Sequence, residues 1–222
     1  MSTSSAHRVY ELLSEAYPDA RCELDYRTPF ELLVATVLSA QSTDVRVNMV
    51  TPVLFERWGT PQAMAGADRD ELEAVIRSTG FFRNKAAALL GLSRAIVDQH
   101  DGETPVEMAE LVALPGVGRK TANVVRGHAF GLPAITTDTH VLRVGKRLGW
   151  TASTVPEKVE TDIGQLFDPR DWTRVSDTLI FHGRRCCHAR KPACGACPVA
   201  PLCPSYGAGP TDPAQARELV KR

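Results

Sequence analysis

The stretch LPGVGRKTANVV, residues 114–125, decides the fold class of this chain. Within this stretch, a glycine turn is followed by Arg119-Lys120-Thr121, which looks at first like the end of a nucleotide-binding P-loop. A P-loop needs a glycine directly before the lysine, another glycine where the loop opens, and a buried strand leading into it. Here Arg119 precedes the lysine, no glycine opens the loop, and the preceding VEMAELVAL is helical in its periodicity. The spacing and the context therefore exclude a nucleoside triphosphate site.

What remains is a helix, a Leu-Pro-Gly-Val-Gly turn and a second helix. Pro115 ends the first helix, and Gly116 and Gly118 permit positive φ and a close approach of another backbone. The second helix then presents unpaired N–H groups and a positive dipole end, which suit a phosphate. We expect a nucleic-acid backbone to lie against the turn, at residues 116–119: Gly116, Val117, Gly118 and Arg119. The alternative is the glycine-rich cap of an ordinary helical hairpin, which explains one glycine better than two.

The composition is that of an ordinary globular protein. The chain has 222 residues, of which 43% are hydrophobic and 23% charged, and its formal net charge is 0. No apolar run approaches the ~20 residues of a membrane span, and the polar start lacks a signal peptide, so we expect a cytosolic protein. Zero net charge argues against a highly basic nucleic-acid protein but conceals patches. Residues 184–191 are locally basic, either as a solvated surface or as a binding patch.

Helical periodicity dominates the rest of the chain and predicts an all-α fold. Thr28-Pro29 opens a helix as cap and first-turn proline, and the following FELLVATVLSA is apolar almost all round, as in a buried central helix. Further helices are expected at residues 7–17, 44–58, 69–78, 84–100 and 105–111. No alternating strand pattern is convincing, and residues 133–137 are too few to form one.

Five of the six cysteines lie between Cys186 and Cys203, so they indicate one local site; Cys22 stands apart as a small core residue. In a cytosolic chain such a group argues against a disulfide framework. Four of them have the spacing C-x6-C-x2-C-x5-C: Cys187, Cys194, Cys197 and Cys203. Four thiolates in so short a segment indicate a metal site, and spacing alone leaves zinc and an iron–sulfur cluster as comparable options.

Lys120 and Asp138 are the two residues whose local context suggests chemistry. A lysine attacks carbon only as the neutral amine, and both the positive end of a helix and burial favour that form. The alternative for Lys120 is a surface cation that binds a phosphate. Asp138, in Thr136-Thr137-Asp138-Thr139-His140, reads locally as a helix N-cap, and a rigidly held cap carboxylate can also serve a reaction.

The order of these motifs resembles the helix-hairpin-helix DNA glycosylases of the endonuclease III family. Besides the hairpin, the matching blocks are FELLVATVLSAQSTD, LPAITTDTHVLRV and HGRRCCHARKPACGACPVAPLC, and the likeness runs from about Tyr10 to Cys203. The resemblance implies two helical domains with a DNA-binding groove between them. Residues 22–132 would form a six-helix barrel domain with the hairpin. Residues 1–21 and 133–222 would form the second domain, with a cluster loop at 187–203 and a loosely ordered tail.

The resemblance also implies a reaction, that of a bifunctional DNA glycosylase and AP lyase that removes oxidised pyrimidines. Lys120 matches the lysine that attacks C1′, expels the base and forms a Schiff base, after which β-elimination cuts the strand. Asp138 matches the aspartate that assists activation and stabilises charge on the sugar. The expected partner is double-stranded DNA with damaged pyrimidines or abasic sites, bound by a monomer in the cytoplasm, on the nucleoid in a prokaryote. The alternatives are a non-catalytic or redox-sensing DNA-binding module and a glycosylase with another base preference.

Other positions carry over from the family one by one. Gln41 matches the glutamine that fills the gap left by the extruded nucleotide, and Phe81 lies near the apolar wedge, although it could also be a core aromatic. The cysteine spacing is that of the family's 4Fe–4S site, with Cys187, Cys194, Cys197 and Cys203 as ligands and Cys186 as a spare thiol. Arg190 and Lys191 would project from the cluster loop toward a DNA phosphate. Val112 stands where some relatives carry a glutamate, which bears on the choice of damaged base.

Overall fold

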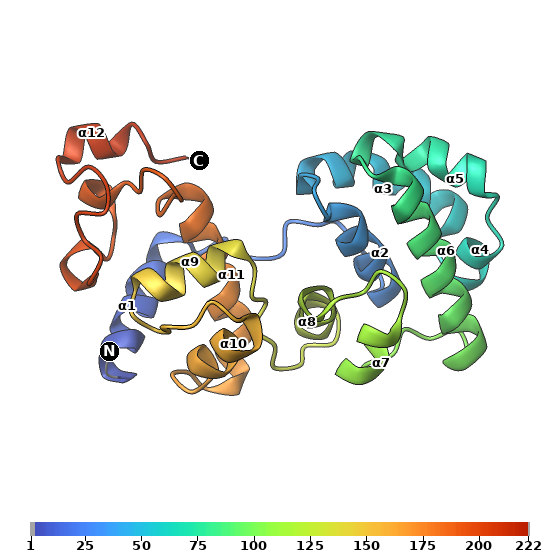
Figure 1. The fold of residues 1–222 in the computed structure, drawn as a ribbon, viewed down its shortest axis with the longest axis horizontal. Helices are drawn as coiled ribbons and strands as arrows, with labels where there is room; N and C mark the ends of the chain where they lie inside the picture. Colours follow the sequence, from blue (N-terminus) through green and yellow to red (C-terminus); the bar gives the residue numbers. More distant parts are fainter. Residues whose placement is uncertain (1–2, 222) are drawn as a thin grey trace. The chain divides into compact units, whose positions relative to one another are not determined.

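The computed structural model describes residues 3–221, and within them it is entirely helical, with no β-strand (Figure 1). The all-α prediction is confirmed. The α-helices are α1 Thr3–Ala16, α2 Pro29–Ser39, α3 Asp44–Trp58, α4 Pro61–Ala65, α5 Arg69–Ile76, α6 Phe82–Gln99, α7 Met108–Ala113, α8 Arg119–His128, α9 Thr139–Arg147, α10 Pro156–Gly164, α11 Trp172–Arg185 and α12 Pro213–Arg217. Short 3-10 turns are η1 Arg77–Thr79, η2 Pro169–Asp171, η3 Cys194–Ala196 and η4 Ala200–Leu202. None of the described helices is both long and apolar enough to cross a membrane.

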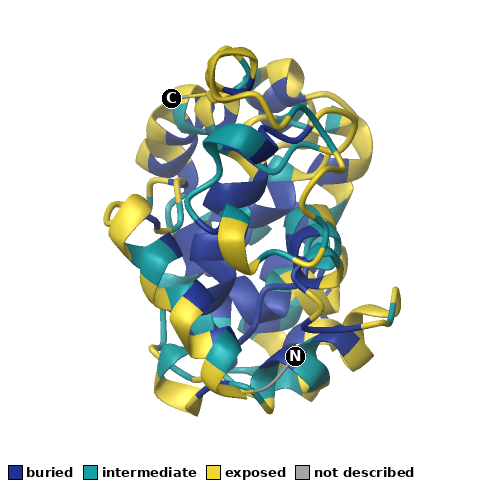
Figure 2. Ribbon diagram, turned by 90° about the vertical axis from the view of Figure 1, so that its left-hand side faces the viewer, coloured by how far each residue is buried: buried dark blue, intermediate teal, exposed yellow. Residues whose placement is uncertain are grey.

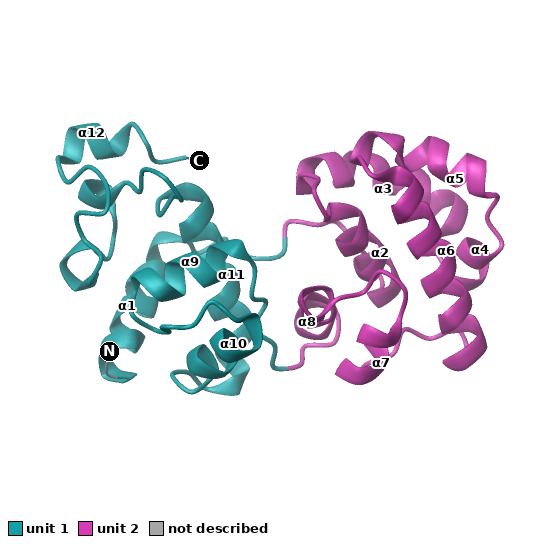
Figure 3. Cartoon of the chain, in the orientation of Figure 1, with its two compact units in different colours: residues 1–22, 133–222 teal, residues 23–132 magenta. Residues whose placement is uncertain are grey.

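The chain divides into two compact units (Figure 3). Unit 1 comprises residues 1–22 and 133–222, and unit 2 comprises residues 23–132. Unit 2 is therefore inserted between α1 and the rest of unit 1, and the chain crosses from one unit to the other twice.

Unit 2 is built around α2. Residues 30–38 of this helix are all buried, as its continuous apolar sequence predicts. Thr28 caps the helix by accepting a hydrogen bond from the Glu31 amide, and Pro29 occupies its first turn. The buried Glu31 carboxylate accepts bonds from the Arg27 amide at 2.7 Å and from the Arg27 guanidinium at 2.9 Å. Without this pairing, the Glu31 carboxylate would be an unpaired buried charge at the start of α2, which is energetically costly.

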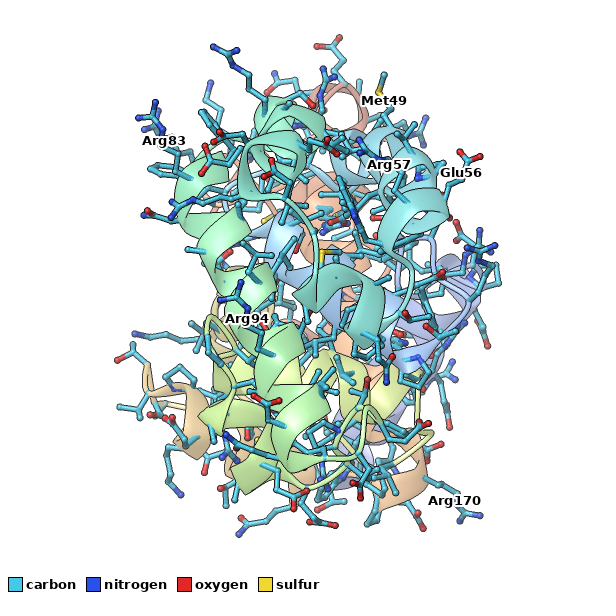
Figure 4. All side chains as sticks on the ribbon, turned by 90° about the vertical axis from the view of Figure 1, so that its right-hand side faces the viewer. Met49, Glu56, Arg57, Arg83, Arg94 and Arg170 are labelled. Carbon is cyan, nitrogen blue, oxygen red and sulfur yellow. The ribbon has the colours of Figure 1, made fainter. Side chains whose placement is uncertain are left out.

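The helices that surround α2 are amphipathic. In α3, Val47, Leu54 and Phe55 face the core, whereas Met49 projects to the surface (Figure 4). The long helix α6 buries Lys85 together with an apolar face, and this lysine is taken up again below. The hairpin helices α7 and α8 pack against each other, and α8 packs against α2.

Unit 1 has its own core, formed by one face of each of α1, α9, α10 and α11. The helix ribbons are dark blue on the inner side and yellow on the outer side (Figure 2). Arg174, on α11, binds the backbone carbonyls of Tyr17, Pro18 and Ala20 and so fixes the end of the segment that follows α1. Trp150 and Phe167 pack ring against ring at 5.0 Å within the same core.

The tail from Gly207, predicted to be loosely ordered, is described as far as Lys221. It forms α12, whose N-cap Asp212 accepts a bond from the Gln215 amide. Ala216 of this helix is fully buried against the cysteine-rich segment, residues 186–203. The His188 ring binds the carbonyl of Leu219 at 2.7 Å. The small and polar composition of the tail concealed these few anchoring contacts.

Two smaller expectations fail. The helix expected at 105–111 spans Met108–Ala113 instead, and the carbonyl of Val106, just before it, accepts a bond from Arg126 at 2.6 Å. Cys22, expected in the core, is only half-buried.

Candidate active site and cysteine-rich segment

The turn of the hairpin is held by close backbone contact with α6. Gly116 has a φ of +77°, and a Cβ added there would lie 2.7 Å from the Cβ of Ala88. One turn further along α6, a Cβ added at Gly91 would lie 3.2 Å from the Pro115 ring. Close approach and backbone conformation therefore both require glycine at position 116, whereas a side chain at position 91 would crowd the Pro115 ring.

Gly118 has a different role from the one expected. Its φ is −99°, so the expectation that a positive φ requires glycine at this position is wrong. It is the N-cap of α8, it supplies no side chain to the first-turn amides, and a Cβ there would meet nothing within 4 Å. Val117 fixes the turn from below with a buried side chain. The start of α8 is therefore uncapped by a side chain and open to a bulky group.

Lys120 lies in the first turn of α8 and is exposed, so the expected burial is not observed. The helix buries Ala122, Asn123 and Val125 on the side that packs against the rest of unit 2. Exposure depends on what covers a residue in the fold, and the local sequence does not encode that. The dipole of α8 still points its positive end toward this turn, and the first turn holds no acidic residue to offset it.

Asp138 is the N-cap of α9, as its sequence context predicted. Its Oδ1 accepts hydrogen bonds from the amides of His140 at 2.7 Å and Val141 at 2.9 Å. Both bonds use the same carboxylate oxygen, and the side chain is half-buried. The carboxylate is thus fixed in direction while it keeps a second oxygen for another partner.

Helix α9 connects this cap to the cysteine-rich segment through Arg143. Its guanidinium donates to the carbonyls of Gly183 and Cys187, both at 3.1 Å, and it lies 2.9 Å from His140 Nδ1. A Cβ added at Gly183 would lie 2.8 Å from the same His140 nitrogen, so α9 and α11 approach closely here. Burial, with the Arg143 and Arg184 charges adding to it, lowers the pKa of His140.

Arg147, one helical turn after Arg143, binds the same segment. It donates to the His188 carbonyl at 2.6 Å, to the Ala189 carbonyl at 2.9 Å and to the Cys187 sulfur at 3.3 Å. The two arginines therefore hold residues 187–189 against α9 by four hydrogen bonds to backbone and sulfur, and Arg143 adds a fifth to the Gly183 carbonyl on α11. Such charge-assisted bonds are stronger than neutral ones.

The cysteines of this segment line one cavity. Its walls include five thiols, namely Cys186, Cys187, Cys194, Cys197 and Cys203. The thiols of Cys186 and Cys197 and a nitrogen of the buried His182 lie within 4.8 Å of one another. A cavity lined by sulfur donors at this density fits a thiolate-bound metal cluster in its donor chemistry.

The surroundings favour thiolates at two of these positions. Cys186 donates a hydrogen bond to Cys197 and, with His182 adding to it, lowers the pKa of Cys197 to about 4. Burial would raise the pKa of Cys187, but hydrogen bonds from His182 and Arg147 outweigh it and the pKa is lowered. Tyr17, from the end of the first segment of unit 1, holds His182 through its hydroxyl at 3.1 Å. Thiolates are the form of cysteine that binds metal.

The comparisons with known proteins agree with this geometry. Residues 34–169 match the family model of the HhH-GPD superfamily of base excision DNA repair proteins. Endonuclease III of Synechocystis sp. is 54% identical over 201 residues, which cover 90% of this chain and 92% of that protein. The chain belongs to the endonuclease III family.

Solved structures of endonuclease III share the fold. One, in a non-covalent complex with DNA, has a TM-score of 0.88 and 43% identity, with coverage of 93% of this chain and 97% of that one. A trapped covalent intermediate of endonuclease III with DNA matches with the same TM-score of 0.88 and 43% identity, over 93% of this chain and 97% of that one. Residues 187–203 match the iron–sulfur binding domain of endonuclease III, which begins here at Cys187 and ends at Cys203. The segment is thus an iron–sulfur binding domain, and the cluster of this family is of the 4Fe–4S type.

The other residues carried over from the endonuclease III family lie on the surface. Gln41 and Phe81 are exposed, Phe81 at 69%, and both have a left-handed backbone, with φ of 57° and 48°. Phe81 is therefore not a core aromatic. Arg190 and Lys191 are exposed within the cysteine-rich segment, and Val112 is exposed on α7.

Sequence reasoning missed Arg143, Arg147 and Lys85. The two arginines stand four residues apart on a nine-residue helix directly behind the Asp138 cap, a spacing that places them on one face. Lys85 shares its helical face with apolar residues of α6, and a charge on a core face is itself a signal. His182 and Tyr17 are separated by 165 residues, and no local pattern connects them.

Proposed function

We propose that the chain is a bifunctional DNA glycosylase and AP lyase of base excision repair that removes oxidised pyrimidines. The observation that carries the proposal is an exposed lysine, Lys120, in the first turn of an uncapped helix in a chain of the endonuclease III family. The trapped covalent intermediate of a 43% identical endonuclease III supports an enzyme that forms a bond to DNA.

Lys120 is the proposed nucleophile. Its Nζ forms a bond to C1′ of the damaged nucleotide as the C1′–base bond breaks and the base leaves with its electron pair and a proton. Ring opening gives the iminium, which acidifies a proton on C2′. Loss of that proton breaks the C3′–oxygen bond and releases the 3′ strand, and water then frees the lysine. Because Lys120 is exposed in the structure, its amine is accessible to the sugar of a bound nucleotide.

Asp138 is the proposed assisting carboxylate. Two amide hydrogen bonds fix its Oδ1 at the start of α9, where the helix dipole favours a negative charge. An ionised carboxylate stabilises positive charge that develops on the sugar as the base departs. A cap that cannot rotate supplies this stabilisation without reorganising during the reaction.

The DNA contacts divide into backbone and gap contacts. The amides around residues 116–119 and the exposed Arg190 and Lys191 are proposed to bind phosphates, which fix position without reading sequence. Gln41 and Phe81 are proposed to occupy the space left when the nucleotide is turned out of the duplex. The exposure of Gln41 and Phe81 supports this role.

The cluster is proposed to be held by Cys187, Cys194, Cys197 and Cys203, with Cys186 as the spare thiol. The match over residues 187–203 supports this register over one that begins at Cys186. When bound, the cluster supplies four iron–sulfur bonds that fold the segment. The chain's own arginines and His182 orient the cysteines, and the bond-breaking steps use Lys120 and Asp138 alone.

The partner is proposed to be double-stranded DNA that contains a damaged pyrimidine or an abasic site. The endonuclease III structures in complex with DNA support this partner. We further propose that the protein acts as a monomer in the cytoplasm, on the nucleoid of a prokaryotic cell.

Borohydride trapping on an abasic duplex tests the reaction. Wild type is expected to form a covalent adduct, and Lys120→Gln is expected to form none and to lose at least about 10³-fold in lyase rate, because the nucleophile is gone. Arg119→Gln is the matched control, since it removes the neighbouring cation and keeps the amine. It is expected to bind DNA more weakly and still form the adduct at saturating protein.

The outcomes separate the candidates. An adduct that survives Lys120→Gln would show that another amine attacks. No adduct with wild type would leave a DNA-binding module as the function. A panel of duplexes with oxidised pyrimidines, mismatches and alkylated bases then measures which base is removed; excision confined to mismatches or alkylated bases would contradict the proposed substrate.

A further inference from the structure

Lys85 is a buried lysine that the proposed reaction does not use. It lies in the first turn of α6 and is only 5% exposed, on the same face as Leu89, Leu92 and Ile96, each of which is fully buried. Two residues earlier, Arg83 projects from the same helix to the surface (Figure 4). Burial lowers the pKa of the Lys85 ammonium. A cation in such a place is retained only where its hydrogen bonds offset its desolvation.

The ammonium of Lys85 binds the ends of two other elements of unit 2. It donates a hydrogen bond of 2.8 Å to the carbonyl of Leu38, in the last turn of α2, and another of 2.8 Å to the carbonyl of Thr79, the last residue of η1. Leu38 and Lys85 are 47 residues apart in the chain. The Nζ of Lys85 therefore links the start of α6 to the ends of α2 and η1.

Both carbonyls lie where a helix has run out of amide donors. In a continuing helix the carbonyl of Leu38 would accept from the amide of Ser42, but that amide donates to Ser39 at 3.0 Å. The carbonyl of Thr79 is followed by Gly80, at a φ of +71°, so its segment also ends. Helix C-termini carry partial negative charge and attract cations, so an ammonium is the appropriate donor to both.

The two turns fixed in this way are those that present Gln41 and Phe81. Gln41 follows Leu38 by three residues, and Phe81 follows Thr79 by two. Among the described residues only these two and Asp101 have positive φ without being glycine. A left-handed backbone at such residues persists only when the surrounding structure enforces it. The Lys85 hydrogen bonds are an enforcing contact common to both turns.

We infer that Lys85 is a positioning residue whose ammonium fixes the spacing of the two turns, so that Gln41 and Phe81 enter the duplex gap together. This inference rests on the proposed function. It assigns Lys85 no contact with the substrate and no part in bond breaking. Its effect is confined to steps in which a nucleotide leaves an intact duplex.

The test compares two substrates with the full-length, cluster-loaded protein. One is a duplex with a thymine glycol, whose excision requires extrusion of the nucleotide. The other is a single strand with a preformed abasic site, which needs no extrusion before borohydride trapping. Lys85→Met keeps the apolar stem of the side chain, lacks the terminal nitrogen and so removes both hydrogen bonds. We expect it to lower kcat/KM on the duplex by about 10- to 100-fold and to leave single-strand trapping within about twofold of wild type.

Arg83→Met is the matched control, because it removes a cation from the same helix turn at an exposed position. It is expected to leave both readouts within about twofold. A second readout places 2-aminopurine opposite a stable abasic analogue in a duplex. Wild type and Arg83→Met should raise its fluorescence on binding, as the base loses its stacking, and Lys85→Met should raise it less.

A double variant tests whether Lys85 acts through Gln41. If it does, Gln41→Ala in the Lys85→Met background costs less than Gln41→Ala in wild type. Full additivity of the two losses would contradict the inference. Should Lys85→Met not fold, Lys85→Gln keeps an NH2 donor group on a shorter side chain and is expected to show a smaller, duplex-specific loss.

Two results would overturn the inference while the proposed function stands: normal duplex excision by Lys85→Met, or an equal loss on duplex and single strand, which would mark a purely structural role. Absence of any adduct with wild type would overturn the proposed function itself and the inference with it.

Discussion

The hairpin and the cysteine-rich segment are held in place by opposite means. The hairpin turn lies against α6 through glycine backbone and small apolar contacts, at Gly116 on Ala88 and Pro115 on Gly91. The cysteine-rich segment has almost no apolar core of its own; Cys186, Ala193 and Ala216 form its small buried cluster. It is held mainly by hydrogen bonds from the arginines of α9, by the insertion of Val199 into the core of unit 1 and by the cluster that its cysteines would bind.

The difference teaches what each region depends on. Close packing needs no ligand and tolerates no added volume, so the hairpin should keep its shape when the cluster is lost and fail when one methyl group is added. The cysteine-rich segment should show the reverse behaviour. The following predictions test this contrast, from the largest expected effect to the smallest.

Removal of the cluster by oxidation and chelation should affect only one of the two regions. We expect hydrogen exchange to accelerate strongly in residues 186–221, because the free energy of metal binding is folding free energy for such a segment. Residues 107–128 should keep their protection. Mass spectrometry of the exchanged peptides measures both regions in one sample. Equal loss of protection in the hairpin would contradict the contrast.

Gly116→Ala should destabilise the protein by about 2–4 kcal/mol, because alanine is strained at positive φ and its methyl group would collide with Ala88. Gly118→Ala is the matched control, since its φ is negative and its added methyl group meets nothing. Its stability should stay within about 0.5 kcal/mol of wild type, while its DNA affinity falls because the methyl group obstructs the phosphate. Urea unfolding and duplex titration measure the two quantities.

Arg147→Gln should destabilise unit 1 by about 1–3 kcal/mol, because it removes three hydrogen bonds to residues 187–189. The neighbouring Lys146, which is exposed, offers the control Lys146→Gln, with an expected change within about 0.5 kcal/mol. Urea unfolding measures the stability. Absorbance at ~400 nm measures the cluster content, because a bound iron–sulfur cluster is expected to give a broad band there. Unchanged stability in Arg147→Gln would show that the cluster alone holds the segment.

The smallest expected effect is a pH dependence at His140. Burial, and then the charges of Arg143 and Arg184, lower its pKa, while Asp138 opposes them. The folded state therefore favours neutral His140, and the unfolded state binds more protons near the ordinary pKa of ~6.5. The free energy of unfolding should fall as the pH falls through that window. In His140→Gln it should fall less between about pH 8 and about pH 5.5. Urea unfolding at both pH values decides; parallel curves for the two proteins would assign the loss to other groups.

Local sequence predicted what local chemistry determines. The caps at Thr28 and Asp138, the buried run of α2 and the positive φ of Gly116 all follow from residue types and spacing. The cysteine spacing identified the metal segment, and the resemblance supplied the cluster type that spacing left open.

Burial and long-range contacts could not be predicted in this way. Lys120 was expected to be buried and is exposed, because what covers a helix start is set by tertiary structure. The contacts of the tail after Gly207, through the buried Ala216 and the His188 bond to Leu219, were not predicted either. The role of Lys85 depends on a carbonyl 47 residues away, which no window of sequence contains.

The insertion of unit 2 within unit 1 has a consequence for synthesis on the ribosome. Helix α1 emerges first, but its apolar face, with Ala6, Val9 and Leu13, packs against α11, which begins only at Trp172. At about 5–20 residues per second, α1 waits on the order of 10 s for its partner, while all of unit 2 has been made. We therefore expect the apolar face of α1 to stay without its partner while unit 2 is synthesised, and α1 to be the segment on which a chaperone acts during translation.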